Sequence, residues 1–242
     1  MNFLRFVYYF LRRYYDSVNY AIEGILHAAK TQSHVRFHLS AACFLLLVCF
    51  SIGISPSEFV ILTTLATIVI VAEMLNSAIE VTVDIASPEH SEKARIAKDI
   101  AAGAVLVAAA AAAIIAFFIF YPYFHYFIEY GIVIAQHGVV DLIFGSTMIV
   151  LITVIMMKAY VGKGHPLRGG LPSGHSALAF TWWVNIVFIY KDFYLTVIFF
   201  ACAIAIAVSR VVRKIHTIYE VCIGIMTGTV ITWGLYLIFY KG

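Results

Sequence analysis

Long apolar segments separated by short polar ones run through nearly the whole chain. The hydrocarbon core of a bilayer is about 30 Å thick and needs about 20 apolar residues per helical crossing. The pattern therefore predicts an all-α, polytopic membrane helical bundle with about seven transmembrane helices. The predicted spans are residues 39–55, 59–86, 100–120, 131–157, 172–190, 193–209 and 221–240. Before them, residues 1–30 mix aromatic side chains with arginines, which predicts an amphipathic helix on the inner membrane surface.

Composition excludes a soluble domain. Hydrophobic residues make up 63% of the 242 residues and charged residues only 12%, whereas a soluble domain has about 25% charged residues. The net charge of +3 is concentrated at span ends. Lysine and arginine at span ends mark the cytoplasmic side of a membrane protein. The charge therefore predicts the orientation of the chain in the membrane, and no nucleic-acid partner is expected. The four cysteines lie in apolar runs without metal-ligand spacing, which favours buried thiols.

The polar residues change in character near residue 122. The segment 88–99 is dense in charges of both signs, whereas later charges are isolated cations and histidines at span ends. We therefore expect two functional units, residues 1–122 and residues 123–242. The two halves share neither motif nor spacing, so no internal repeat is predicted.

Four polar side chains share one face of the second predicted span. They are Glu73, Asn76, Glu80 and Asp84. At 3.6 residues per turn they fall within roughly an 80° arc, and an ionisable group at membrane depth normally marks a functional site. Neighbouring carboxylates repel unless a cation neutralises them, so the face suits a divalent metal with nucleotide phosphates and proton abstraction from a lipid hydroxyl. The alternative is polar contact between helices.

With these residues, the first half resembles the prokaryotic diacylglycerol kinase and undecaprenol kinase family. The matching stretches are RFHL at 36–39, AEMLNSAIEVTVD at 72–84 and AKDIAAGAVL at 97–106. The resemblance implies Mg²⁺ and ATP as cofactors, Glu73 as general base and Glu80 as a metal ligand. It implies a nucleotide and lipid site made by Tyr20, Asn76, Glu89, Lys98 and Asp99. It further implies a homotrimer or other homo-oligomer in the bacterial cytoplasmic (inner) membrane.

One position departs from this family. Where the family carries a metal-binding glutamate shortly before the RFHL stretch, this chain has Gln32. An amide oxygen can coordinate a hard cation, but it removes one negative charge from the site. Two alternatives stay open: an active kinase with Gln32 as a metal ligand, or a silent scaffold that keeps the fold.

The second half places cations, a hydroxyl group and imidazoles at span ends. The set is Lys158, Ser173, Gly174, His175, Arg210, His216 and Glu220. A helix that begins at Ser173 and Gly174 can present backbone N–H groups to an anion, while Lys158 and Arg210 add positive charge. His216 and Glu220 are one helical turn apart, so the carboxylate can accept one imidazole N–H and leave the other nitrogen free to attack. His175 would protonate the leaving oxygen, and no metal is required.

This ordered set resembles the three motifs of the type 2 phosphatidic acid phosphatase family, over about residues 131–240. The resemblance implies that His216 is a nucleophile forming a phosphohistidine, that Glu220 orients it and that His175 is the general acid. It implies phosphate binding by Lys158, Ser173, Gly174 and Arg210, without a cofactor.

Two residues differ from those that this family usually has. The predicted orientation of the site in the membrane also differs from the family's. Glu220 replaces the usual aspartate, and His165 replaces an arginine whose charge Arg168 or Lys163 can supply. The family's site usually opens on the outer face. The bias of basic residues here puts Lys158 on the cytoplasmic side if residues 121–157 cross once.

Together the two units predict a membrane enzyme that dephosphorylates a lipid phosphate or diphosphate and carries a fused ATP-dependent lipid kinase. Its partners would be a long-chain lipid and the bilayer. Undecaprenyl lipids suit both units, because phosphorylating the alcohol and trimming the diphosphate give one product. The first alternative is a phosphatase for phosphatidate-type lipids with a silent kinase-like scaffold. The second, a transporter or channel, would need broken, inverted repeats that the sequence lacks.

Overall fold

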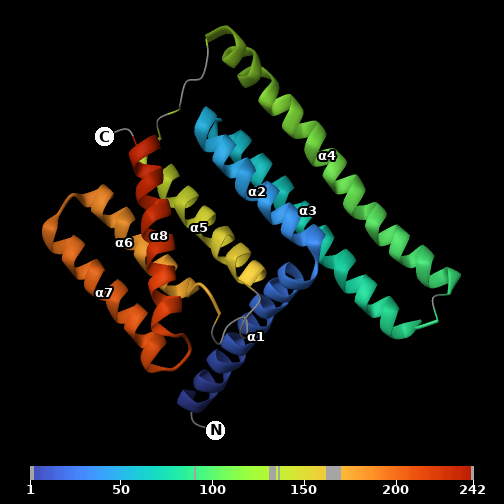
Figure 1. Cartoon of the computed structure of the whole chain (residues 1–242), viewed down its shortest axis with the longest axis horizontal. Coiled ribbons are helices and arrows are strands. Elements are labelled where there is room, and N and C mark those ends of the chain that lie inside the picture. The colour runs from blue at the N-terminus through green and yellow to red at the C-terminus, as the bar shows by residue number, and fades with distance from the viewer. Residues whose placement is uncertain (1–2, 90, 131–134, 136, 162–169, 241–242) are drawn as a thin grey trace.

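The chain is described here from a computed structural model that covers residues 3–89, 91–130, 135, 137–161 and 170–240. The described residues form eight α-helices, which confirms the all-α prediction (Figure 1). They are α1 (Phe3–Thr31), α2 (Ser33–Ile52), α3 (Pro56–Ala86), α4 (Glu92–Tyr130), α5 (Val139–Val161), α6 (Gly174–Tyr190), α7 (Phe193–Val212) and α8 (Ile218–Phe239).

Six of these helices are long and apolar enough to cross a membrane: α2, α3, α4, α5, α7 and α8. The remaining predicted span, the fifth (residues 172–190), forms α6, a helix of 17 residues. The remaining helix, α1, separates its apolar and polar side chains onto different faces, as predicted for residues 1–30. The protein is therefore a multi-pass membrane bundle with an amphipathic helix at its start.

Local sequence explains where the early helices begin and end. Gly53 has φ 66°, a left-handed conformation that glycine adopts without strain, and it ends α2. The next helix begins at once, because Pro56 starts α3 and Ser55 and Glu58 form a reciprocal capping box. These signals make the α2–α3 turn short, so the two helices lie antiparallel.

Two predicted boundaries differ from the observed helices. The proposed division between units at residue 122 lies inside α4, because that helix continues through Pro122 to Tyr130. The fourth span was predicted from residue 131, but α5 begins at Val139, and residues 131–134 and 136 lie outside the described part of the chain.

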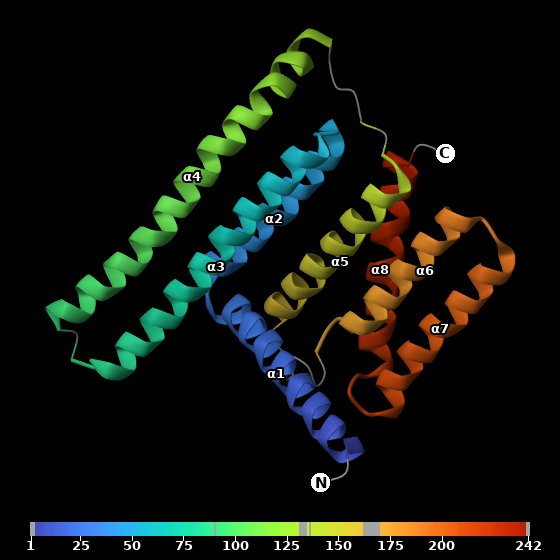
Figure 2. The ribbon, with the colours of Figure 1, turned by 180° about the vertical axis from the view of Figure 1, so that it is seen from behind.

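The helices form two groups, joined by α1 and by the packing of α2 against α5 (Figures 1 and 2). In the first group α3 lies between α2 and α4, and in the second α5, α6 and α8 pack together with α7 against α6. Close packing of α6 on α8 depends on Gly224 and Gly228, because a Cβ atom at either would collide with the backbone of Ser173 or Ala177. The glycines thus bring the start of α6 against α8.

The two groups meet at both ends of the bundle. We call the end that carries α1 and the α7–α8 turn the inner end, and the opposite end the outer end (Figure 1). At the outer end a His137 ring nitrogen lies 2.7 Å from the Phe50 carbonyl oxygen. At the inner end, Ala29 of α1 packs with Ala159 of α5. Within the described residues, Lys191 is the only lysine or arginine at the outer end.

Candidate active sites

A histidine–carboxylate pair lies at the inner end of the second group. The Nδ1 atom of His216 is 2.9 Å from Oε2 of Glu220, and His216 is 8% exposed. The turn between α7 and α8 holds this histidine, because the Arg210 carbonyl accepts the N–H groups of Ile215 and His216 at 3.0 and 3.2 Å. The sequence predicts both residues on one helix, but His216 lies in the turn before α8 and only Glu220 is helical. The spacing of four residues still gives the contact.

Three donors fix the Glu220 carboxylate. Its Oε2 atom accepts the Thr217 N–H at 3.1 Å as well as His216 Nδ1, and its Oε1 atom accepts the Gly170 N–H at 3.0 Å. Because a carboxylate can only accept, the Nδ1 atom of His216 carries the hydrogen. The Nε2 atom of the neutral ring is then left with its lone pair.

The surroundings of His216 favour its neutral form. Burial lowers the pKa of His216, and the positive charges of Lys158 and Arg210 lower it further. The hydrogen bond and charge of Glu220 oppose this shift, yet the pKa stays below its ordinary value. A neutral imidazole at physiological pH is the form that can act as a nucleophile.

The first turn of α6 lies beside this pair and offers donors to an anion. The Ser173 N–H donates to the Glu220 carbonyl oxygen at 2.9 Å, which ties the start of α6 to α8. Ser173 precedes the helix without making a side-chain cap, and its hydroxyl lies 2.9 Å from that of Ser176. Helix-start N–H groups that no side chain caps can bind a phosphate oxygen.

Two cations and a second histidine surround His216. Lys158 is buried near the end of α5, and Arg210 is half-buried near the end of α7. His175 is exposed in the first turn of α6 and lies within electrostatic range of Lys158, Arg210 and His216. The structure thus brings together all predicted phosphatase residues except Arg168. Arg168 lies with His165 and Lys163 outside the described residues.

The acidic face of α3 is partly buried in the first group. Glu73 and Asn76 are 5% and 7% exposed, and the Asn76 amide donates to Glu80 Oε1 at 3.2 Å. The Asn76 Oδ1 atom is buried without a hydrogen-bond partner among the described residues. Near the inner end, Asp84 pairs with Lys98 across the α3–α4 turn.

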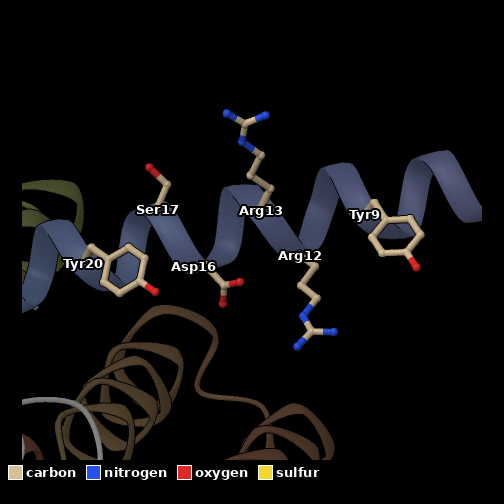
Figure 3. Close-up of a pocket in the computed structure, with 6 residues that line it drawn as sticks. All are labelled: Tyr9, Arg12, Arg13, Asp16, Ser17 and Tyr20. Carbon is tan, nitrogen blue, oxygen red and sulfur yellow. The ribbon is translucent and has the colours of Figure 1, made fainter.

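The other residues predicted for the kinase site lie at four separate places in the fold. Asp99 is exposed on α4 and pairs with Arg95 at 2.7 Å, and Glu89 is exposed in the α3–α4 turn. Gln32 is the residue before α2. Tyr20 is 71% exposed on α1 and lines a shallow cavity of about 480 Å³ along that helix, on the same side as Arg12 (Figure 3).

The donor set on α3 fits a hard metal ion only in part. The oxygen atoms of Glu73, Glu80 and Asn76 are the donor type that Mg²⁺ prefers, and the unpartnered Asn76 Oδ1 atom suits an added ligand. However, the described residues contain no group of three or more histidine, cysteine, aspartate or glutamate side chains that could hold a metal. Nucleotide phosphates would have to supply the remaining oxygen ligands.

Sequence reasoning missed three contributors to the phosphatase site. Thr217 forms a capping box with Glu220, and this Thr-x-x-Glu signal is readable in the sequence. The Gly170 N–H and the Ser176 hydroxyl are different, because they reach the site through the folding of the 170–176 segment onto α8. No local pattern marks them.

The comparisons with known proteins assign the two candidate sites to two different families. Residues 19–120 match the family model for prokaryotic diacylglycerol kinase, and residues 159–242 match the PAP2 superfamily. The undecaprenol kinase of Bacillus subtilis is 40% identical over 112 residues, which cover 46% of this chain and 91% of that protein. Diacylglycerol kinases of Haemophilus influenzae and Pseudomonas aeruginosa are 30% and 31% identical over 93 and 98 residues. These matches cover 38% and 40% of this chain and 79% and 80% of those proteins. Among solved structures, none matches the chain.

Fold, site geometry and these matches define a membrane enzyme in which a lipid kinase domain is fused to a lipid phosphatase domain. The chain belongs to the prokaryotic diacylglycerol kinase family and carries a PAP2 domain after the kinase-like helices.

Proposed function

We propose that the PAP2 domain hydrolyses a lipid phosphate or diphosphate through a phosphohistidine on His216. In the first step Nε2 of His216 attacks phosphorus, the bond from phosphorus to the leaving oxygen breaks, and His175 gives that oxygen a proton. Glu220 holds the ring and stabilises the charge that develops on it. Lys158, Arg210 and the start of α6 bind the phosphoryl oxygens.

In the second step water attacks the phosphohistidine. Its proton passes to His175, the P–N bond breaks, and inorganic phosphate leaves with His216 restored. No electron donor or metal takes part, because the cations of the chain provide the electrostatic stabilisation. The second step therefore needs no group beyond water, His175, His216 and the cations of the chain.

The observation that carries this proposal is the buried His216–Glu220 contact of 2.9 Å beside the start of α6. We expect His216→Ala to abolish phosphate release from a lipid phosphate while the protein still inserts and folds. His125→Ala is the matched control, because His125 is an exposed histidine on α4 far along the chain from the site. Full turnover by the His216→Ala protein would refute the nucleophile assignment.

For the kinase domain we propose ATP-dependent phosphorylation of a lipid alcohol, with Glu73 as the general base. Glu80, Asn76 and Gln32 would contribute oxygen ligands to Mg²⁺, and Lys98, Asp99, Glu89 and Tyr20 would bind nucleotide and lipid. When bound, Mg²⁺–ATP supplies the phosphoryl group and neutralises the acidic face. Glu73→Gln should abolish transfer of radiolabelled phosphate from ATP to a lipid alcohol and leave phosphatase activity unchanged. If the wild-type protein transfers no phosphate with added Mg²⁺, the domain is a scaffold.

We propose an undecaprenyl lipid as the common substrate, in the cytoplasmic membrane and with the chains assembled as homo-oligomers. The kinase of Bacillus subtilis to which the first domain is similar is an undecaprenol kinase. Phosphorylating that alcohol and trimming its diphosphate would both yield the monophosphate. A direct test compares the kcat/KM of purified protein for undecaprenyl diphosphate with that for phosphatidate; a higher value for phosphatidate would contradict the choice of lipid.

A further inference from the structure

A long cavity of about 810 Å³ lies between the kinase and phosphatase domains. Helix α2 packs against both α3 and α5, and residues of all three helices line the cavity (Figures 1 and 2). Its α3 wall runs from Pro56 to Ile70, which is about 20 Å at 1.5 Å per residue. The cavity therefore extends over about two thirds of a hydrocarbon core about 30 Å thick.

The interior of the cavity is apolar. Among its described lining residues, only His137 and Asp141 have a charged or imidazole side chain, and both lie at the outer end. The hydroxyl groups of Thr63 and Thr67 donate to carbonyl oxygens of their own helix, those of Phe59 and Thr63, at 2.8 Å. The lining between the outer end and Ile70 therefore suits a hydrocarbon chain better than a polar ligand.

The cavity is a groove that opens toward the bilayer. Its α2 floor is buried, as at Ala42. Its rims carry exposed apolar side chains, which are Val60 and Ile68 on α3 and Phe144 and Met148 on α5. Because these helices are long and apolar enough to span the membrane, lipid surrounds the rims. A lipid chain can therefore enter the groove from the side.

The groove is in register with the acidic face of α3. Phe59, Thr63, Ala66 and Ile70 line it at helical spacing, and Glu73 is the next position along the same stripe. Glu73 follows Ile70 by three residues, a rise of about 4.5 Å. A chain attached to a hydroxyl group at Glu73 would therefore pass directly into the groove.

We infer that this groove binds the hydrocarbon chain of the lipid alcohol that the kinase domain phosphorylates, and that α5 of the phosphatase domain forms one wall of it. The inference rests on the proposed kinase function. A helix of a second copy is too large an occupant, because a helix 10 Å wide and 20 Å long takes about 1600 Å³, about twice the volume of the groove. The fused domain thus takes part in recognising the kinase substrate.

The test uses the full-length protein with Met148→Trp, which fills the groove from the phosphatase domain. The matched control is Leu151→Trp, at an exposed position on α5 outside the groove lining. We expect Met148→Trp to raise the KM for a long-chain lipid alcohol by about tenfold, as when about two methylene groups lose their burial. The kcat should stay within about twofold. The KM values for ATP and for a short-chain alcohol should not change, because the short chain ends before Met148.

Photolabelling provides a readout that does not depend on turnover. A long-chain alcohol with a diazirine at the end of its chain should label Phe144 and its neighbours in the wild type and in Leu151→Trp. Excess unlabelled alcohol should suppress this labelling, and Met148→Trp should reduce it. If such labelling occurs but no phosphate is transferred from Mg²⁺–ATP, the proposed kinase function fails while the assignment of the groove to a lipid chain stands.

Two results would overturn the inference. One is labelling that is equal in all three proteins or that unlabelled alcohol does not suppress. The other is a disulfide between two copies of Met148→Cys in a protein without its native cysteines, which would mean that a second copy covers the groove. If Met148→Trp also loses activity on the short-chain alcohol, it disturbs the fold. Ala66→Phe, which narrows the groove from α3, then decides by the same KM comparison.

Discussion

The smallest functional unit of the phosphatase domain is a residue pair whose two members have different tasks. His216 is kept neutral by burial and by neighbouring cations, which makes its free nitrogen available. Glu220 acts in the opposite direction on the pKa of His216, since its hydrogen bond and charge favour the protonated ring. Glu220 therefore holds the imidazole ring in position, and it also makes the ring easier to protonate.

The pH dependence of kcat/KM should follow this pair. Protonation of His216 inactivates the nucleophile, and its pKa is lowered, so activity should fall only below the ordinary imidazole value as pH decreases. Glu220→Gln removes the charge that raises the pKa of His216. We expect its acidic limb to lie at lower pH still and its kcat to drop by about 100-fold or more. An acidic limb that moves to higher pH in this variant would contradict the assigned contact.

The two proposed reactions should differ in their dependence on a divalent metal ion. EDTA should stop phosphate transfer from ATP and leave lipid phosphate hydrolysis unchanged, because in the proposed mechanisms only the kinase reaction uses a divalent cation. Gln32→Glu should lower the Mg²⁺ concentration that gives half-maximal kinase activity by adding a negative charge to the proposed set of metal ligands. Loss of phosphatase activity on chelation would mean that the cationic site does not act alone.

At the scale of elements, the phosphatase site depends on how closely α6 approaches α8. Gly224 and Gly228 are one turn apart on α8, and each faces backbone atoms of the α6 segment. At this contact the Ser173 N–H donates a hydrogen bond to the Glu220 carbonyl oxygen. The start of α6 and Glu220 therefore keep their relative position through helix packing.

A larger residue at this contact should loosen both the fold and the site. Gly228→Ala places a methyl group against the Ala177 carbonyl, where the backbone cannot yield without moving α6. We expect a loss of about 1–3 kcal/mol in the free energy of unfolding and a lower kcat. Gly234→Ala is the control, since nothing lies within 4 Å of its added Cβ atom. Differential scanning fluorimetry in detergent would measure both; equal unfolding temperatures would argue against the close contact.

At the scale of the whole molecule, both candidate sites lie toward one end of the bundle. The His216 site and the Lys98–Asp84 pair are near the inner end, where every described lysine and arginine except Lys191 also lies (Figure 1). From the positive-inside rule we expect this end to face the cytoplasm. Two reactions on one face can draw on lipids of the same leaflet.

Chemical labelling can test this common face. In a protein without its four native cysteines, Lys93→Cys and Lys214→Cys should react with an impermeant maleimide from the same side of the membrane. Ser57→Cys and Lys191→Cys should react only from the other side. All four positions are exposed at helix ends, so poor access would not explain a negative result. Labelling of positions 93 and 214 from opposite sides would rule out the shared face.

The sequence by itself determined the helices and the residue types of both sites. Apolar length and helical periodicity are local properties, so they predict α2, α3 and the other spans without knowledge of their neighbours. The His216–Glu220 contact is also local, because the two residues are four positions apart, with His216 in the α7–α8 turn and Glu220 in the first turn of α8.

Only the tertiary structure decided how the sites are completed. The Gly170 N–H reaches Glu220 across 50 positions of sequence, and Ala29 reaches Ala159 from the other domain. Such contacts depend on which helices pack together and on where glycines let backbones approach. The apolar pattern that predicts a span does not specify its partner. For this reason the residues of the phosphatase site could be named from the sequence, whereas the packing of the α1–α2 corner against α5 could not.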